Sequence, residues 1–109
     1  MSKIKIALAS SDGVNIDTHF GKCRRFSIIE MDTITKEFTQ VEIRKSERMC
    51  GPNGHTQEAL NSIKKLLYDC SYVIVARIGI WIVEELKQSG ITAIEFVGEV
   101  KSALNKIKI

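Results

Sequence analysis

The first half of the chain has the hydrophobic pattern of β-strands. An apolar run over residues 4–10 ends in Ser-Ser-Asp-Gly, which is a strong turn signal. A second apolar run covers residues 25–32. A third segment, residues 37–44, places apolar side chains among polar neighbours, as in a half-exposed edge strand. Because the connections are short, we expect these three strands to form an antiparallel meander.

The second half alternates between helical and strand patterns. Apolar residues recur at helical spacing over residues 56–70, and the nearly continuous β-branched run over residues 71–79 is typical of a central strand. Residues 80–89 predict a second helix, closed by Gly90 in a left-handed cap. A further strand is expected over residues 91–97. The apolar face of a C-terminal helix consists of Val100, Ala103, Leu104 and Ile107.

The predicted order of elements is therefore β-β-β-α-β-α-β-α. Three strands followed by alternation predict an α/β fold with a mixed five-stranded sheet and helices on both faces. At 109 residues the chain has the size of one folding unit, so we expect a single domain over residues 1–109. No apolar run approaches the roughly 20 residues of a membrane helix. The N-terminus lacks the pattern of a signal peptide, and we expect a cytoplasmic protein without a membrane partner.

The cysteine count, net charge and aromatic content limit the kinds of binding site that the chain can form. Three cysteines are an odd number, so we expect free thiols that bind a metal or pack in the core, not a closed disulfide framework. Cys70 falls on the apolar stripe of the first predicted helix, which indicates packing. The net charge of +3 is mild, the basic residues are scattered, and the chain has one tryptophan and two tyrosines. A nucleic-acid surface needs clustered charge and stacking aromatics, so no nucleic-acid partner is predicted.

Two loops carry the reactive side chains. His19 and Cys23 lie in "HFGKC", and Cys50 and His55 lie in "MCGPNGHT". If the first strand and the strand over 71–79 are adjacent and parallel, the first loop and Arg77 share the carboxyl edge of the sheet, where α/β proteins bind ligands. The position of the second loop depends on the length of the third strand. We expect one crevice lined by these five side chains.

The residue types in this crevice favour a metal cluster. Thiolates bind iron–sulfur clusters, zinc and Cu(I), and imidazole binds iron, zinc and copper. Arg77 does not ligate metals but pairs with anionic groups. Backbone N–H groups in the glycine-rich turns and after Gly79 add donors for an anion. This combination suits a bulky, negatively charged cluster better than a bare ion.

Each candidate also has a structural interpretation. His19 either contacts a metal or braces its own loop, Cys23 either ligates or packs, and His55 either ligates or supports the start of the helix. A Cys2His2 zinc site is conceivable, but the pairs H-x3-C and C-x4-H differ from the usual zinc-knuckle spacing, and the core does not need a metal to fold. Asp12 and Asp17 are assigned to turns, and Trp81 to packing or an interface.

Three stretches together resemble the dinitrogenase iron–molybdenum cofactor biosynthesis family. They are "ALASSDGVNIDTHFGKCRRFSIIEM", "CGPNGHTQEALNSIKKLLYDCSYVIVARIG" and "LKQSGI", and they cover nearly the whole chain. The family includes NifX, the C-terminal domain of NifB and the cofactor-binding domain of the nitrogenase accessory factor. The resemblance implies a ribonuclease H-like, three-layer α/β/α sandwich. It also implies a non-catalytic protein that transiently binds an iron–sulfur or iron–molybdenum cofactor precursor and passes it to nitrogenase or to cofactor-assembly proteins.

The resemblance also assigns residues to the binding site. His19 and Gly21 match the His-Phe-Gly motif of the family, and Arg77 and Gly79 match its Arg-Ile-Gly motif. The positions that match members with extra thiols are Cys23, Cys50 and His55. The chain departs from the family pattern at Ile80 and Trp81, where many members have small or proline residues. These two side chains are expected to crowd the start of the second helix.

Two other classes of function fit the sequence less well. A nuclease needs carboxylates that converge on metal ions, and the candidates Asp12, Asp17 and Asp32 fall in turns without such convergence. A thiol oxidoreductase would need a Cys-x-x-Cys motif, which the sequence lacks. The alternative that stays open is a protein-interaction module that uses the exposed third strand and Trp81. In that case the cysteines would be incidental.

Overall fold

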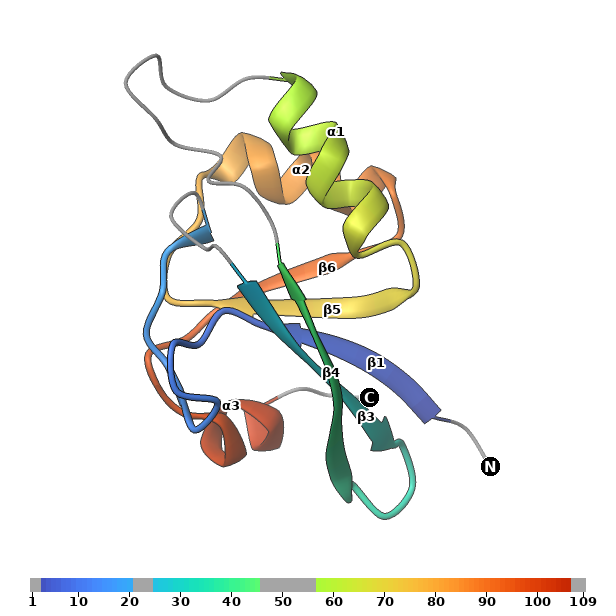
Figure 1. Cartoon of the computed structure of the whole chain (residues 1–109), viewed down its shortest axis with the longest axis vertical. Coiled ribbons are helices and arrows are strands. Elements are labelled where there is room, and N and C mark those ends of the chain that lie inside the picture. Colours follow the sequence, from blue (N-terminus) through green and yellow to red (C-terminus); the bar gives the residue numbers. More distant parts are fainter. Residues whose placement is uncertain (1–2, 21–24, 46–56, 107–109) are drawn as a thin grey trace.

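The computed structural model describes residues 3–20, 25–45 and 57–106 of the chain (Figure 1). Its elements are β1 (Lys3–Leu8), β2 (Asn15–Ile16), β3 (Arg25–Asp32), β4 (Phe38–Lys45), α1 (Gln57–Leu66), β5 (Cys70–Val75), α2 (Ile80–Gln88), β6 (Thr92–Glu95), β7 (Gly98–Glu99) and α3 (Val100–Lys106). None of the helices in these ranges is long and apolar enough to span a lipid bilayer.

The main sheet has five strands in the order β4-β3-β1-β5-β6. The pairs β4–β3 and β3–β1 are antiparallel, and the pairs β1–β5 and β5–β6 are parallel. The predictions of a mixed five-stranded sheet and of an antiparallel meander are therefore confirmed. The first strand and the strand before α2 are adjacent and parallel, which was the condition for a shared edge.

The sheet separates two hydrophobic cores, because successive side chains of a strand point to opposite faces. In β1, Ala7 belongs to the first core and Leu8 to the second. Helices α1 and α2 cover the first core, and α3 covers the second, so helices lie on both faces of the sheet (Figure 1). The helical side chains in the two cores are Leu60, Ile63, Ile82 and Leu86 on one face, and Val100, Ala103 and Leu104 on the other.

Two predicted boundaries were wrong. Cys70 is the first residue of β5 and not part of the first helix, because α1 ends at Leu66 and the Cys70 N–H donates to the Leu67 carbonyl in a tight turn. The apolar spacing nevertheless predicted correctly that Cys70 is buried, since this residue is 3% exposed. The strand predicted over 71–79 ends at Val75, and the chain beyond it leaves the sheet to pair with a loop.

The short strands β2 and β7 were not predicted. They pair only Asn15 with Glu99 and Ile16 with Gly98, which is too short to leave a periodic pattern. The left-handed cap after α2 is confirmed, because Gly90 has φ +84°. The exposed edge strand is confirmed as well, since β4 lies at the margin of the sheet with mostly exposed side chains.

Candidate functional site

The ends of the main-sheet strands define one edge, which we call the carboxyl edge. The parallel strands β1, β5 and β6 all finish there, with Leu8 opposite Ile74 and Val75 opposite Glu95. The antiparallel partners contribute their other ends, because β3 begins and β4 finishes at the same edge, as the pairing of Leu8 with Ser27 shows. The chain thus brings ends of all five strands to this edge.

The loop after β1 is organised by two aspartates. Asp12 Oδ1 accepts hydrogen bonds from the backbone N–H groups of Asn15 (2.9 Å) and Val14 (2.8 Å). Asp17 accepts hydrogen bonds from the hydroxyl and the backbone N–H of Ser11. These donors lower the pKa of both carboxyl groups from their usual value of 3.8. The assignment of both aspartates to turns is confirmed.

The same loop crosses from one face of the sheet to the other. Ile16 is buried in the core beneath α3, and Phe20 is buried in the core beneath α1 and α2. Between them, the backbone N–H groups of Asp17 and Thr18 lie 3.3 Å from the Ala9 carbonyl oxygen, at the end of β1. The crossing segment therefore runs over the carboxyl edge with an apolar anchor on each side.

His19 lies in this crossing and is joined to Arg77 through the backbone. The Ala76 N–H donates to the Thr18 carbonyl at 3.0 Å, and the Phe20 N–H donates to the Arg77 carbonyl at 2.9 Å. These bonds flank an isolated parallel bridge between His19 and Arg77. The structure thus brings two sequence-predicted site residues side by side from segments 58 positions apart.

The side chains of His19 and Arg77 are both available to a ligand. Each is exposed: Phe20 next to His19 fills the core, and Arg77 lies two residues beyond the end of β5. In the part of the chain that the structure describes, neither the imidazole nor the guanidinium makes a side-chain hydrogen bond or an ion pair. The edge therefore presents one metal-binding nitrogen donor and one permanent positive charge next to each other.

The N-terminus of α2 lies immediately beyond Arg77. Gly79 occupies the cap position, without a side-chain cap, and the first turn contains no acidic residue. Trp81 lies next to Gly79, since a Cβ on that glycine would be 3.8 Å from Trp81 Cδ1. Ile80 instead points away from the protein and is 80% exposed. Trp81 is thus close to the helix start, as expected, whereas Ile80 leaves it open.

The other sequence-predicted ligands lie outside the described residues. These are Gly21, Cys23, Cys50 and His55. Within the described ranges, no three His, Cys, Asp or Glu side chains gather in a way that could hold a metal ion. Of the predicted lining, the described residues bring His19 and Arg77 together, with Gly79 two residues after Arg77. The crevice itself and the thiol ligands stay predictions.

One residue of the edge was missed by the sequence reasoning. Glu95, the last residue of β6, accepts a hydrogen bond from the Ile78 N–H at 3.0 Å through Oε2. Nothing in the sequence singles out this glutamate, because it ends an ordinary strand 17 positions after Ile78. Only the placement of β6 beside β5 brings it to the Arg-Ile-Gly turn.

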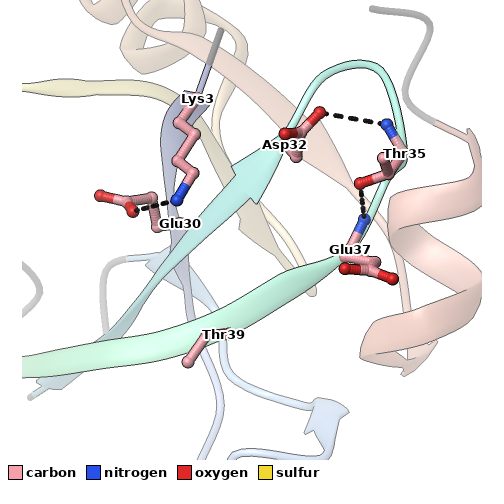
Figure 2. A pocket seen from close by; sticks show the side chains of 6 residues that line it. All are labelled: Lys3, Glu30, Asp32, Thr35, Glu37 and Thr39. Carbon is pink, nitrogen blue, oxygen red and sulfur yellow. Dashed lines mark hydrogen bonds and ion pairs between the residues drawn. The ribbon is translucent and has the colours of Figure 1, made fainter. Parts of the chain in front are cut away.

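A separate cavity of about 270 Å³ lies at the opposite edge of the sheet, where β1 begins (Figure 2). Two of its three carboxylates, those of Glu30 and Asp32, have partners. Glu30 pairs with Lys3 at 3.7 Å, and Asp32 accepts hydrogen bonds from the N–H groups of Ile34 and Thr35 in the β3–β4 turn. The lining is completed by Glu37 and Thr39. These contacts give the lining side chains a structural role. The cavity is separate from the edge that carries His19 and Arg77.

Comparison with known proteins identifies relatives along almost the whole chain. The family model described as dinitrogenase iron-molybdenum cofactor matches residues 2–108. The FeMo cofactor biosynthesis protein NifB of Chlorobaculum tepidum is 31% identical over 99 residues, which cover 91% of this chain and 22% of that protein. NifB of Rhodobacter capsulatus is 30% identical over 91 residues, which cover 84% and 20%. The chain thus spans about a fifth of the length of the curated relatives it matches.

Solved structures support the fold. The NMR structure of a putative NifB protein from Thermotoga has a TM-score of 0.57 at 19% identity, covering 94% of this chain and 84% of that one. A crystal structure of another protein has a TM-score of 0.66 at 20% identity, covering 94% and 87%. At this level of identity the likeness concerns the arrangement of the backbone.

Proposed function

Because the chain belongs to the dinitrogenase iron–molybdenum cofactor family, we propose that its carboxyl edge binds an iron–sulfur or iron–molybdenum cofactor precursor and passes it on during metallocluster assembly. The observation that carries the proposal is the bridge between His19 and Arg77, two exposed side chains from distant segments held next to each other. The cluster is the cargo of this protein and is released unchanged to the next assembly protein.

The two side chains have complementary roles toward such a cargo. The imidazole of His19 offers a nitrogen lone pair to a metal of the cluster. The positively charged guanidinium of Arg77 pairs with sulfide or carboxylate groups of the cargo. The uncapped N-terminus of α2, with no acidic residue in its first turn, adds to the positive potential. Cys23, Cys50 and His55 are the proposed further ligands.

A carrier role is better supported than a catalytic one. The carboxylates nearest to His19 along the chain, Asp12 and Asp17, are occupied by hydrogen bonds that shape the loop. A hydrolytic metal centre would instead need several carboxylates with free oxygens directed at one point. We also assign the fold to the ribonuclease H-like three-layer class, on the basis of the two cores on opposite faces of a mixed sheet.

Binding of isolated iron–molybdenum cofactor under anaerobic conditions tests the proposal. Visible absorption and metal analysis of the separated protein give stoichiometry and affinity. We expect the native chain to form a coloured complex, and His19→Ala and Arg77→Gln each to weaken binding by about tenfold, equivalent to ~1.4 kcal/mol. Lys65→Gln removes an exposed positive charge from the end of α1 and is the matched control. Binding by the control should equal that of the native chain.

The outcomes separate the parts of the proposal. If the native chain takes up no cofactor, the carrier role is wrong. If the double variant His19→Ala, Arg77→Gln binds as tightly as the native chain, the cargo is held elsewhere. The triple variant His19→Ala, Cys23→Ala, Cys50→Ala extends the test to the thiols, and undiminished binding by it would remove them from the ligand set.

A protein-interaction module is the second candidate, favoured by exposed apolar side chains. Val41 and Ile43 on the edge strand β4 are each 47% exposed, and Trp81 is 43% exposed. For this function, pull-down with cofactor-assembly proteins should retain a partner after substitution of His19 and Arg77. Loss of that partner in the His19 and Arg77 variants would instead favour the carrier site.

A further inference from the structure

The Arg-Ile-Gly turn is fixed from two sides. On one side, the crossing loop bonds to Ala76 and Arg77 through the backbone of Thr18 and Phe20. On the other side, the Ile78 N–H donates to Glu95 Oε2 at 3.0 Å. Arg77 therefore lies between a backbone pairing and a side-chain bond. Among the contacts that the described residues make with this turn, the second is the one that a single substitution can remove without touching the backbone.

The direction of the Glu95 side chain follows from the strand. Ile94 and Phe96 pack toward the core beneath α3, whereas Ala93 packs toward the core beneath α1 and α2. Because side chains alternate along a strand, Glu95 shares the face of Ala93, which is the face on which α2 begins. Its position opposite Val75 places the carboxylate alongside the four residues, 76–79, that connect β5 to α2.

A carboxylate is an unfavourable choice at a site for anionic cargo unless its position serves another purpose. Among the described residues, the bond that the Glu95 side chain makes is the one to the Ile78 N–H, and a hydrogen bond to a charged acceptor is stronger than one to a neutral acceptor. The strand end thus uses a negative charge to hold the backbone that carries Arg77 and the start of α2.

We propose that Glu95 is a positioning residue of the cofactor site: it holds the Ile78 amide and thereby fixes the backbone that directs Arg77 and the first turn of α2 toward the cargo. The identity of the cargo in this inference rests on the proposed function. The placement of the turn by Glu95 does not depend on it. Glu95 acts through the turn and does not itself contact the cofactor.

Two substitutions separate position from charge. Glu95→Gln keeps an acceptor oxygen for the Ile78 N–H and removes the charge, whereas Glu95→Ala removes both. Glu84→Ala, which removes an exposed glutamate from α2, is the control for charge alone. The first measurement is amide hydrogen exchange at Ile78 in the protein without cofactor. We expect Glu95→Ala to exchange about fivefold faster or more, Glu95→Gln to exchange at a rate between those of Glu95→Ala and the native chain, and Glu84→Ala to stay near the native rate.

The second measurement is the anaerobic titration with isolated iron–molybdenum cofactor. We expect Glu95→Ala to bind several-fold more weakly than the native chain, and Glu95→Gln to bind as tightly or more tightly. If Glu95→Ala and Glu95→Gln tighten binding equally, Glu95 acts by its charge and the positioning role is wrong. An unchanged exchange rate at Ile78 in Glu95→Ala also overturns it. Failure of the native chain to bind refutes the cargo, while the exchange data still decide the placement of the turn.

Discussion

Asp69 is the centre of an ion-pair cluster that ties the edge strand to the turn between α1 and β5. Arg44 on β4 reaches both carboxylate oxygens, with Nη1 2.6 Å from Oδ1 and Nη2 2.9 Å from Oδ2. Lys5 on β1 donates to Oδ2 at 3.1 Å, and Arg44 Nη1 also donates to the Leu66 carbonyl at 2.8 Å. The informative perturbation is Asp69→Asn, which keeps the shape of the side chain and removes its charge.

The expected loss of stability in Asp69→Asn follows from the geometry and the exposure of the Arg44–Asp69 pair. The side chains of Arg44 and Asp69 are 13% and 22% exposed, so water reaches them only partly. A hydrogen bond to a charged group contributes about 1.5–3 kcal/mol when buried, and solvent screening reduces this for partly exposed pairs. Asp69 accepts three such bonds, two from Arg44 and one from Lys5, so we expect Asp69→Asn to lower the free energy of unfolding by about 2–3 kcal/mol in total at pH 7. For a domain of this size the melting temperature should fall by roughly 10 °C.

The sign of the pH dependence comes from the same contacts. Hydrogen bonds from Arg44 and then Lys5, opposed by partial burial, hold the pKa of Asp69 well below its usual value of 3.8. A carboxyl whose pKa is lower in the folded state stabilises the fold above its unfolded pKa, and this contribution disappears as the pH falls. The difference in stability between the native chain and Asp69→Asn should therefore be full above about pH 5 and shrink steadily below pH 4.

Urea unfolding followed by circular dichroism at several pH values between 2.5 and 7 measures this difference. Glu84→Gln removes a negative charge from an exposed position of α2 and is the matched control, which should change stability by less than about 0.5 kcal/mol. The reasoning fails if Asp69→Asn costs no more than the control at pH 7. It also fails if the cost is the same at pH 3 as at pH 7, because the ionised form of Asp69 would then have no special role.

Two further predictions concern single positions. Burial raises the pKa of the Cys70 thiol to about 12, so Cys70 should resist alkylation by iodoacetamide at pH 8 until urea unfolds the chain. Mass spectrometry measures the extent of alkylation, and rapid labelling of the folded protein would contradict the prediction. Gly90→Ala places a side chain on a residue with φ +84°, and the resulting backbone strain should lower the free energy of unfolding by about 1 kcal/mol. An unchanged midpoint of urea unfolding would show that the substitution introduces no such strain.

The sequence predicts the main sheet well because its strands have strong, distinct patterns. The run over 25–32 coincides with β3, and the polar alternation over 37–44 correctly marks β4 as an edge strand. The β-branched run that overlaps β5 predicts a central strand, and β5 indeed lies between β1 and β6. In each case the local pattern and the tertiary burial agree, so local reasoning is sufficient.

Other features depend on contacts that leave no local pattern. The strand was predicted to run to residue 79, because the apolar run continues to Ile78, but the chain leaves the sheet after Val75 to pair with the crossing loop. Strands β2 and β7 each have two residues and exist only because distant segments meet. The role of Glu95 depends on the register between β5 and β6, which the composition of either strand does not determine.

The position of His19 is determined by the residues around it rather than by its own chemistry. Ile16 anchors one side of the crossing loop beneath α3, and Phe20 anchors the other side beneath α2. The four-residue step between two buried side chains on opposite faces leaves the intervening backbone no route except over the carboxyl edge, where it bonds to Ala9 and Arg77. A histidine in such a segment is exposed and yet fixed in place, as preorganised binding requires. The same anchoring explains why His19 and Arg77 could be predicted to lie close together from the rule that adjacent parallel strands share one carboxyl edge.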